Sequence, residues 1–252
     1  MTNITIWTLE SDNDAEAVKY LANKLIEHLD ISDTAIRSVG KKAIPRRAKS
    51  GRGDILTNSV KNYLKQDDCL IFVIDSDGVM ASHQRRQEPN SLINQVEKVL
   101  ANNNFSGRVY LAPAIQELEA WLLIDCIGIC CFFAAKRKIY RQNCREKINS
   151  NQKFQRLIGK YQRGNTESIV EAEMGGRGVK EYLVRFSKDV LRTLNPKIKP
   201  VNITREKYKE VFSPEIAKCV EINNATLRRN NSLKNFGKLL IRCRNSTQKA
   251  IQ

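Results

Sequence analysis

The stretch CLIFVIDSDG, residues 69–78, carries the strongest indication of fold class. Its first six residues are apolar and include β-branched side chains, which predicts a short buried strand. A strand that is apolar on both faces is typical of the centre of a parallel sheet that helices cover on each side. Asp75 and Asp77 follow at its C-terminal end, and because side chains alternate along a strand they point to the same side. Open α/β sheets bind their ligands at that edge.

The remainder of the first half alternates in the same way. Strands are predicted at 4–9, 35–39 and 108–112, and helices at about 15–29, 55–66, 91–101 and 115–124. Ser11 and the acidic residues after it supply the N-cap chemistry of the first helix. Strands that alternate with helices at this spacing predict a doubly wound, Rossmann-like parallel sheet with helices on both faces.

The pattern changes near residue 136. A basic helical stretch at 136–160 and a helix at 179–194 are predicted, and no run with the character of a strand stands out. We therefore expect an α/β domain at residues 1–135, followed by a basic, mainly helical lobe at residues 136–252.

The formal charge of +16 is unevenly distributed. Residues 1–135 contain 15 Lys and Arg and 17 Asp and Glu, whereas residues 136–252 contain 28 and 10. The second half therefore carries the whole basic excess, which favours a polyanionic partner, most often nucleic acid. A solvated lysine-rich surface and contact with anionic lipid are the alternatives.

The seven cysteines form no CxxC pair, and residues 1–9 read as a strand rather than as a secretory signal. We therefore expect reduced thiols in a cytoplasmic protein. Cys126, Cys130 and Cys131 lie in an apolar run without a nearby histidine, which favours buried thiols over a zinc site. The same run is too short to cross a bilayer and contains Asp125, so no membrane span is predicted.

Three acidic residues follow strands of one predicted sheet: Glu10 after the first, and Asp75 and Asp77 after the third. Carboxylates gathered at one edge repel one another unless a cation lies between them. A hard ion such as Mg²⁺ or Mn²⁺ suits such oxygen ligands. Bound there, it could polarise a phosphodiester and activate a water molecule. The alternative is that Asp and Gly simply form a turn after the strand.

Glu117 and Glu119 lie in QELEAWLLID, after the fourth strand. Acidic residues suit the first turn of a helix, but a further catalytic carboxylate is the other reading, and Glu119 is favoured over Glu117. The basic loop at 40–54 is read either as a phosphate clamp or as a solvated loop. The cations that we expect to contact nucleic acid are Arg46, Arg47, Lys49, Arg52, Arg85, Arg86, Arg177 and Lys180.

The stretches TLESDNDAEAV, IFVIDSDG and IQELEAWLLID together resemble the Toprim domains of topoisomerases, primases and OLD-type nucleases. ELEAWLL, Lys207-Tyr208 and the segment 213–217 are similar to a group of small prokaryotic Toprim-like proteins with roles in phage defence or mobile elements. The resemblance implies that Glu10, Asp75 and Asp77 bind the metal. Ser11 stands where the family usually has glycine, and Val79 where a fuller motif has a third aspartate.

These observations predict a cytoplasmic nuclease that depends on Mg²⁺ or Mn²⁺ and hydrolyses DNA or RNA. Glu10, Asp75 and Asp77 would bind metal, with Glu119 as a further catalytic residue. A catalytically silent nucleic-acid-binding or scaffold protein is the first alternative, and a glycosyltransferase with a DxD motif is the second. The sequence leaves open the general base, the oligomeric state and the need for a protein partner.

Overall fold

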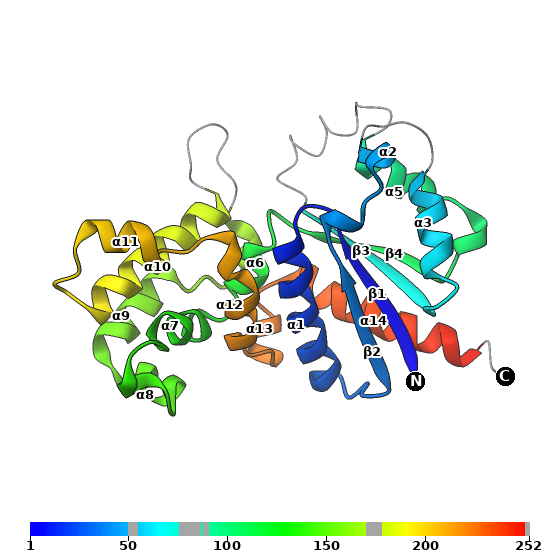
Figure 1. The fold of residues 1–252 in the computed structure, drawn as a ribbon. Coiled ribbons are helices and arrows are strands. Elements are labelled where there is room, and N and C mark those ends of the chain that lie inside the picture. Colours follow the sequence, from blue (N-terminus) through cyan, green and yellow to red (C-terminus); the bar gives the residue numbers. More distant parts are fainter. Residues whose placement is uncertain (50–54, 76–86, 88–90, 170–177, 250–252) are drawn as a thin grey trace.

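The computed structural model describes residues 1–49, 55–75, 87, 91–169 and 178–249. At its centre is a parallel sheet in the strand order β2-β1-β3-β4 (Figure 1). The strands are β1 (Thr2–Thr8), β2 (Thr34–Val39), β3 (Cys69–Asp75) and β4 (Val109–Ala114). The apolar strand at 69–75 lies between β1 and β4, so the prediction of an α/β fold with a central parallel strand is confirmed.

Both faces of β3 are covered because its side chains alternate between two cores. Ile71 and Val73 belong to one core, which also contains apolar residues of α1 (Asp12–His28) and α14 (Asn231–Lys249). Phe72 and Ile74 belong to the other, with residues of α3 (Ile55–Tyr63) and α5 (Leu92–Leu100). Figure 1 shows α1 and α14 on one side of the sheet and α3 and α5 on the other.

Two predictions on the connections were wrong. The basic loop at 40–54 contains short helical turns, η1 (Lys41–Ala43) and α2 (Arg46–Lys49), in its described part. The helix expected at 115–124 is only the four-residue α6 (Glu119–Leu122). The turn before it contains Gln116 at φ +76°, a left-handed conformation that cannot continue an α-helix.

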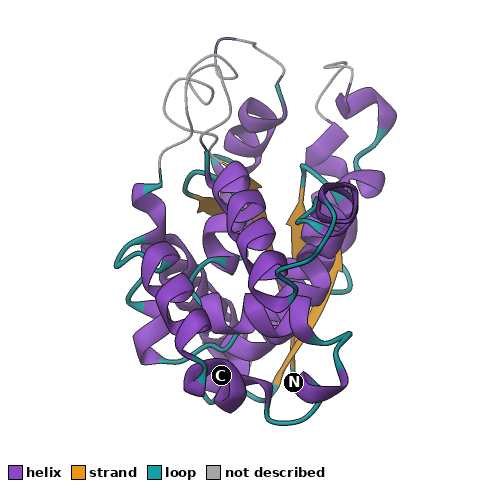
Figure 2. Cartoon of the chain, turned by 90° about the vertical axis from the view of Figure 1, so that its left-hand side faces the viewer, coloured by secondary structure: helices purple, strands orange, loops and turns teal. Residues whose placement is uncertain are grey.

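The described residues after β4 form helices and loops. Besides α6 and α14, the helices are α7 (Cys126–Ala134), α8 (Cys144–Ser150), α9 (Gln152–Tyr161), α10 (Val179–Leu194), α11 (Pro200–Glu206), α12 (Ser213–Cys219) and α13 (Asn224–Leu227). Short 3-10 turns lie at η3 (Lys138–Tyr140), η4 (Thr166–Ser168) and η5 (Glu210–Phe212), and another, η2 (Asn103–Phe105), lies before β4. Within the described ranges, no helix is both long and apolar enough to pass through a membrane. Figure 2 shows the helices that cluster beside the sheet.

Helices from the basic half return to the sheet. α12 packs against α1, where Lys24 Nζ donates to the backbone carbonyl of Lys218 over 2.6 Å. α14 packs against β4, β1 and β3, and its Phe236 stacks on Trp121 with ring centroids 5.3 Å apart. One hydrophobic core therefore runs from Ile4 to Cys243, across the predicted boundary at residue 135. The division into two domains stays a prediction.

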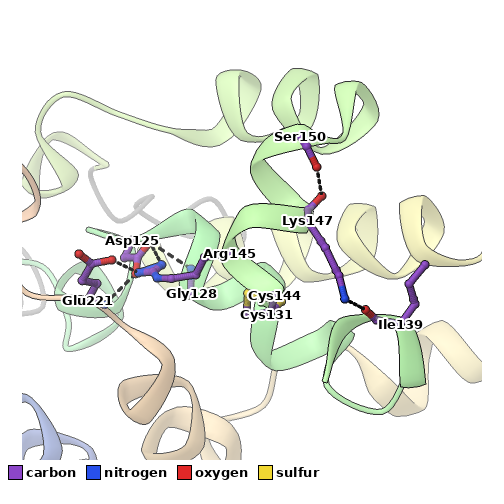
Figure 3. The surroundings of a disulfide bond; sticks show 9 residues. All are labelled: Asp125, Gly128, Cys131, Ile139, Cys144, Arg145, Lys147, Ser150 and Glu221. Atoms are coloured by element: carbon purple, nitrogen blue, oxygen red, sulfur yellow. Dashed lines mark hydrogen bonds and ion pairs between the residues drawn. A yellow bond between two sulfur atoms is a disulfide. The ribbon is translucent and has the colours of Figure 1, made fainter. Parts of the chain in front are cut away.

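The structure pairs four of the seven cysteines, so the expectation that all are reduced was wrong. Cys69 on β3 is bonded to Cys243 on α14, with the Cα atoms 5.6 Å apart. Cys131 on α7 is bonded to Cys144 on α8, with the Cα atoms 5.7 Å apart (Figure 3). Both separations suit a disulfide. The remaining thiols are those of Cys126, Cys130 and Cys219.

Polar contacts also join α7 and α8 close to the disulfide between Cys131 and Cys144 (Figure 3). The buried carboxylate of Asp125 caps α7, because it accepts from the backbone N–H of Gly128 over 3.0 Å. It also accepts from the backbone N–H of Glu221 over 2.7 Å and pairs with the guanidinium of Arg145. Asp125 therefore joins α7, α8 and the segment after α12 through one carboxylate.

Candidate functional site

The ends of β1 and β3 bring two of the predicted ligands to one edge of the sheet. Thr8, the last residue of β1, pairs with Val73 of β3. Glu10 and Asp75 each follow two residues later, and both are half-buried. Asp75 is also paired with Ala114, the last residue of β4. Figure 1 shows that α1 begins at this same edge.

Asp77, the other predicted ligand, lies outside the described residues. Within the described part of the chain, no group of three or more His, Cys, Asp or Glu side chains is arranged to hold a metal ion. The donors that are described there are the carboxylate oxygens of Glu10, two residues after β1, and of Asp75, the last residue of β3. Their chemistry fits Mg²⁺ or Mn²⁺ rather than a soft metal.

Asp14 adds an acidic group to this region that sequence reasoning had assigned only to helix capping. It lies in the first turn of α1, and its backbone N–H donates to Ser11 Oγ over 3.0 Å. Burial raises the pKa of its carboxyl, while the bond to Ser11 and the charges of Lys180 and Lys41 act in the opposite direction. Asp14 lies four residues after Glu10, at the start of the first helix. This spacing could have indicated it as a site residue from the sequence.

Glu119 is the most enclosed of the candidate carboxylates that the structure describes, with 6% of its surface exposed. Its Oε1 accepts from the hydroxyl of Tyr208 over 2.8 Å, and that hydroxyl also lies 2.7 Å from Ser213 Oγ. Burial raises the pKa of Glu119, the bond from Tyr208 and the charge of Lys180 lower it, and the charge of Asp14 raises it further. Glu119, Asp14 and Lys180 therefore share one electrostatic environment.

Glu117 has a different task. Its Oε2 accepts from the backbone N–H of Lys180 over 3.0 Å, in the first turn of α10. A carboxylate is favourable there because the first N–H groups of a helix lack partners within the helix. The sequence had favoured Glu119 over Glu117 for the site. In the structure, Glu117 binds the first turn of α10 instead.

Trp121, on α6, also joins this part of the chain to a later helix. Its Nε1 donates to Ser232 Oγ over 2.8 Å, at the start of α14. Glu117, Glu119 and Trp121 thus contact three separate parts of the second half of the chain. Tyr208, Ser213 and Ser232 were not among the predicted site residues. Tyr208 and Ser213 lie in stretches that carry the Toprim-like resemblance, and that was the signal that could have indicated them.

The predicted nucleic-acid contacts are placed in part. Arg46 is exposed on α2, and the backbone of Arg47 and Lys49 lies in the same short helix. Lys180 is half-buried, and its ammonium group is ion-paired with Glu210. The other expected contacts lie outside the described residues: Arg52, Arg85, Arg86 and Arg177.

Comparisons of the chain with protein-family models, with curated proteins and with solved structures found no match. The resemblance to Toprim domains therefore rests on the residues quoted above and stays a prediction.

Proposed function

We propose that the protein is a divalent-metal-dependent nuclease that hydrolyses phosphodiester bonds of DNA or RNA. The observation that supports this most directly is the placement of Glu10 and Asp75 at the ends of two neighbouring parallel strands, where α/β sheets bind ligands. Glu10, Asp75 and Asp77 would hold Mg²⁺ or Mn²⁺. A bound ion would supply Lewis-acid polarisation of the phosphodiester and lower the pKa of a water molecule.

Glu119 and Lys180 would have further roles in this site. Glu119 is held by Tyr208 and keeps its proton to a higher pH than an exposed glutamate, because burial disfavours its charged form. In this proposal Glu119 is the further catalytic carboxyl group, and it would exchange a proton with the substrate. Lys180 balances part of the negative charge of Asp14 and Glu119.

The basic half of the chain supports a polyanionic substrate. Residues 136–252 carry 28 Lys and Arg against 10 Asp and Glu. Contacts from such residues to the phosphate backbone would be independent of base sequence. Binding should weaken steeply as salt is raised, because each neutralised phosphate releases counterions. An affinity that is flat between 50 and 200 mM salt would contradict a polyanion-binding role.

The decisive experiment measures cleavage of plasmid DNA, single-stranded DNA and RNA in Mg²⁺, Mn²⁺ or EDTA, with binding measured in parallel. Wild type is compared with Asp75→Asn. The matched control is Asp30→Asn, an exposed position between α1 and β2, at the opposite edge of the sheet. Asp30 has φ 54°, a conformation that asparagine also accepts.

We expect metal-dependent cleavage by wild type and Asp30→Asn, and a loss of at least about a hundredfold in Asp75→Asn. Cleavage that survives in Asp75→Asn would place the activity elsewhere. Binding that persists in EDTA without cleavage in any metal would favour a catalytically silent nucleic-acid-binding protein.

A further inference from the structure

A cavity of about 570 Å³ lies among helices that follow the sheet in the chain, and none of its lining residues belongs to a strand. Its walls come from α7, α10, α11, η5 and α12. Cavities of this size accommodate drug-sized ligands when apolar walls are combined with a few polar groups. The proposed nuclease chemistry makes no use of it.

One wall of the cavity is aromatic. The ring centroids of Phe132 and Phe212 are 5.6 Å apart, and those of Phe132 and Phe133 are 4.9 Å apart. Phe132 and Phe212 are half-buried, so part of each ring still faces solvent or a ligand. Packing a flat apolar group against such rings is favourable, because it buries apolar surface and adds contacts between rings.

The rim of the cavity is charged. Lys136 and Arg205 are exposed, and among the described residues neither has an ion-pair partner. Lys218 is already engaged, since it pairs with Glu215 and lies 4.7 Å from the ring centroid of Tyr20. Glu206 also lines the cavity and offsets one positive charge. An anionic group therefore complements the cations that remain, and a neutral ligand would leave them without a partner.

We propose that this cavity binds a small amphipathic anion, a molecule with a flat apolar body and one phosphate or carboxylate group. The body would pack on Phe132 and Phe212, and the anion would contact Arg205 and Lys136. A nucleoside monophosphate and an aromatic carboxylate share this chemistry. Because Phe212 precedes Ser213 in the chain, the ligand would lie one residue away from the hydrogen bonds that hold Glu119.

The test uses the full chain and the fluorescent dye 1-anilinonaphthalene-8-sulfonate, itself a flat aromatic anion. We expect saturable binding to wild type. Arg205→Gln removes a cation of the rim, and Phe132→Leu removes an aromatic ring from the wall. The matched control is Arg141→Gln, an exposed arginine that does not line the cavity. Thermal unfolding of each variant verifies that it is folded as wild type is, so that dye binding does not report exposed core.

The dissociation constant should rise at least about tenfold in Arg205→Gln and in Phe132→Leu, and stay within about twofold in Arg141→Gln. Displacement of the dye by AMP would identify the nucleotide form of the ligand, and displacement by 2-naphthoate the carboxylate form. The proposal is overturned if the dye shows no saturable binding. It is equally overturned if Arg205→Gln binds as wild type does, or if neither competitor displaces the dye.

Discussion

The hydroxyl of Tyr208 donates a hydrogen bond to Glu119 over 2.8 Å, although 89 residues separate the two along the chain. Both side chains are buried, at 2% and 6% exposure. The backbone N–H of Tyr208 donates to Ser187 Oγ on α10 over 2.8 Å, which fixes the tyrosine from a second direction. Residues of the basic half thus hold the buried carboxyl group of Glu119 in place.

Removing the hydroxyl of Tyr208 should destabilise the protein. Tyr208→Phe leaves the carboxyl oxygen of Glu119 buried without this donor and the hydroxyl of Ser213 without this acceptor, so the free energy of unfolding should fall by about 1–3 kcal/mol. Tyr20→Phe is the control, because Tyr20 makes an exposed bond of 3.3 Å to Glu16. Urea unfolding of both variants measures the difference. A Tyr208→Phe variant as stable as the control would show that the buried bond contributes nothing.

The raised pKa of Glu119 predicts how stability depends on pH. The folded protein holds a proton on Glu119 above pH 4.5, the ordinary value, where the unfolded chain has released it. The contribution of this group to the free energy of unfolding therefore falls as pH rises from about 4.5 through the raised pKa. Glu119→Gln lacks this proton equilibrium, so its stability relative to wild type should improve between pH 4 and pH 7. Unfolding is measured in EDTA, and a difference that is constant with pH would refute the raised pKa.

Two glycines in helices should respond oppositely to alanine. A Cβ at Gly128 would lie 2.4 Å from the backbone oxygen of Cys219, and this contact involves backbone that cannot easily move away. Gly128→Ala should therefore cost about 1–3 kcal/mol of unfolding free energy. At Gly159, inside α9, a Cβ meets nothing within 4 Å, so Gly159→Ala should stabilise by about 0.5–1 kcal/mol. Thermal unfolding of the pair measures both signs, and an equal effect at the two positions would contradict the packing around Gly128.

The number of disulfide-bonded cysteines can be measured directly. Alkylation of the protein unfolded without reductant should modify Cys126, Cys130 and Cys219, and alkylation after reduction should modify all seven cysteines. Mass spectrometry reads the number. Seven modified cysteines without reductant would show that neither pair is oxidised in the isolated protein.

The bond between Cys131 and Cys144 should also contribute to stability. Cys131→Ser should lower the free energy of unfolding by about 2–4 kcal/mol under non-reducing conditions, because the cross-link restricts the unfolded chain. Cys219→Ser is the control, since Cys219 is half-buried and not bonded. Reductant should bring wild type toward the variant, and a wild type insensitive to reductant would contradict this expectation.

Local pattern was sufficient for the four strands and for α1, α3 and α5. The continuous apolar run at 69–74 and the polar turn at residues 10–14 each indicate their element from neighbours in sequence alone. The helix at 179–194 was predicted with the bounds of α10, because its apolar residues recur at helical spacing. Placement of Glu10 and Asp75 at one edge followed from the same pattern, since parallel strands end together.

Contacts between distant segments could not be predicted in this way. The helix expected at 115–124 was shortened by the turn at Gln116, where packing of the segment against later helices prevails over local apolar spacing. The hydrogen bond of Tyr208 to Glu119 and the pairing of Cys69 with Cys243 also depend on packing between distant segments. The sequence by itself determined a parallel α/β sheet with acidic residues at its edge and a basic helical second half. Only the tertiary structure decided which helices return to that sheet, because burial of their apolar faces depends on the whole core rather than on any local stretch.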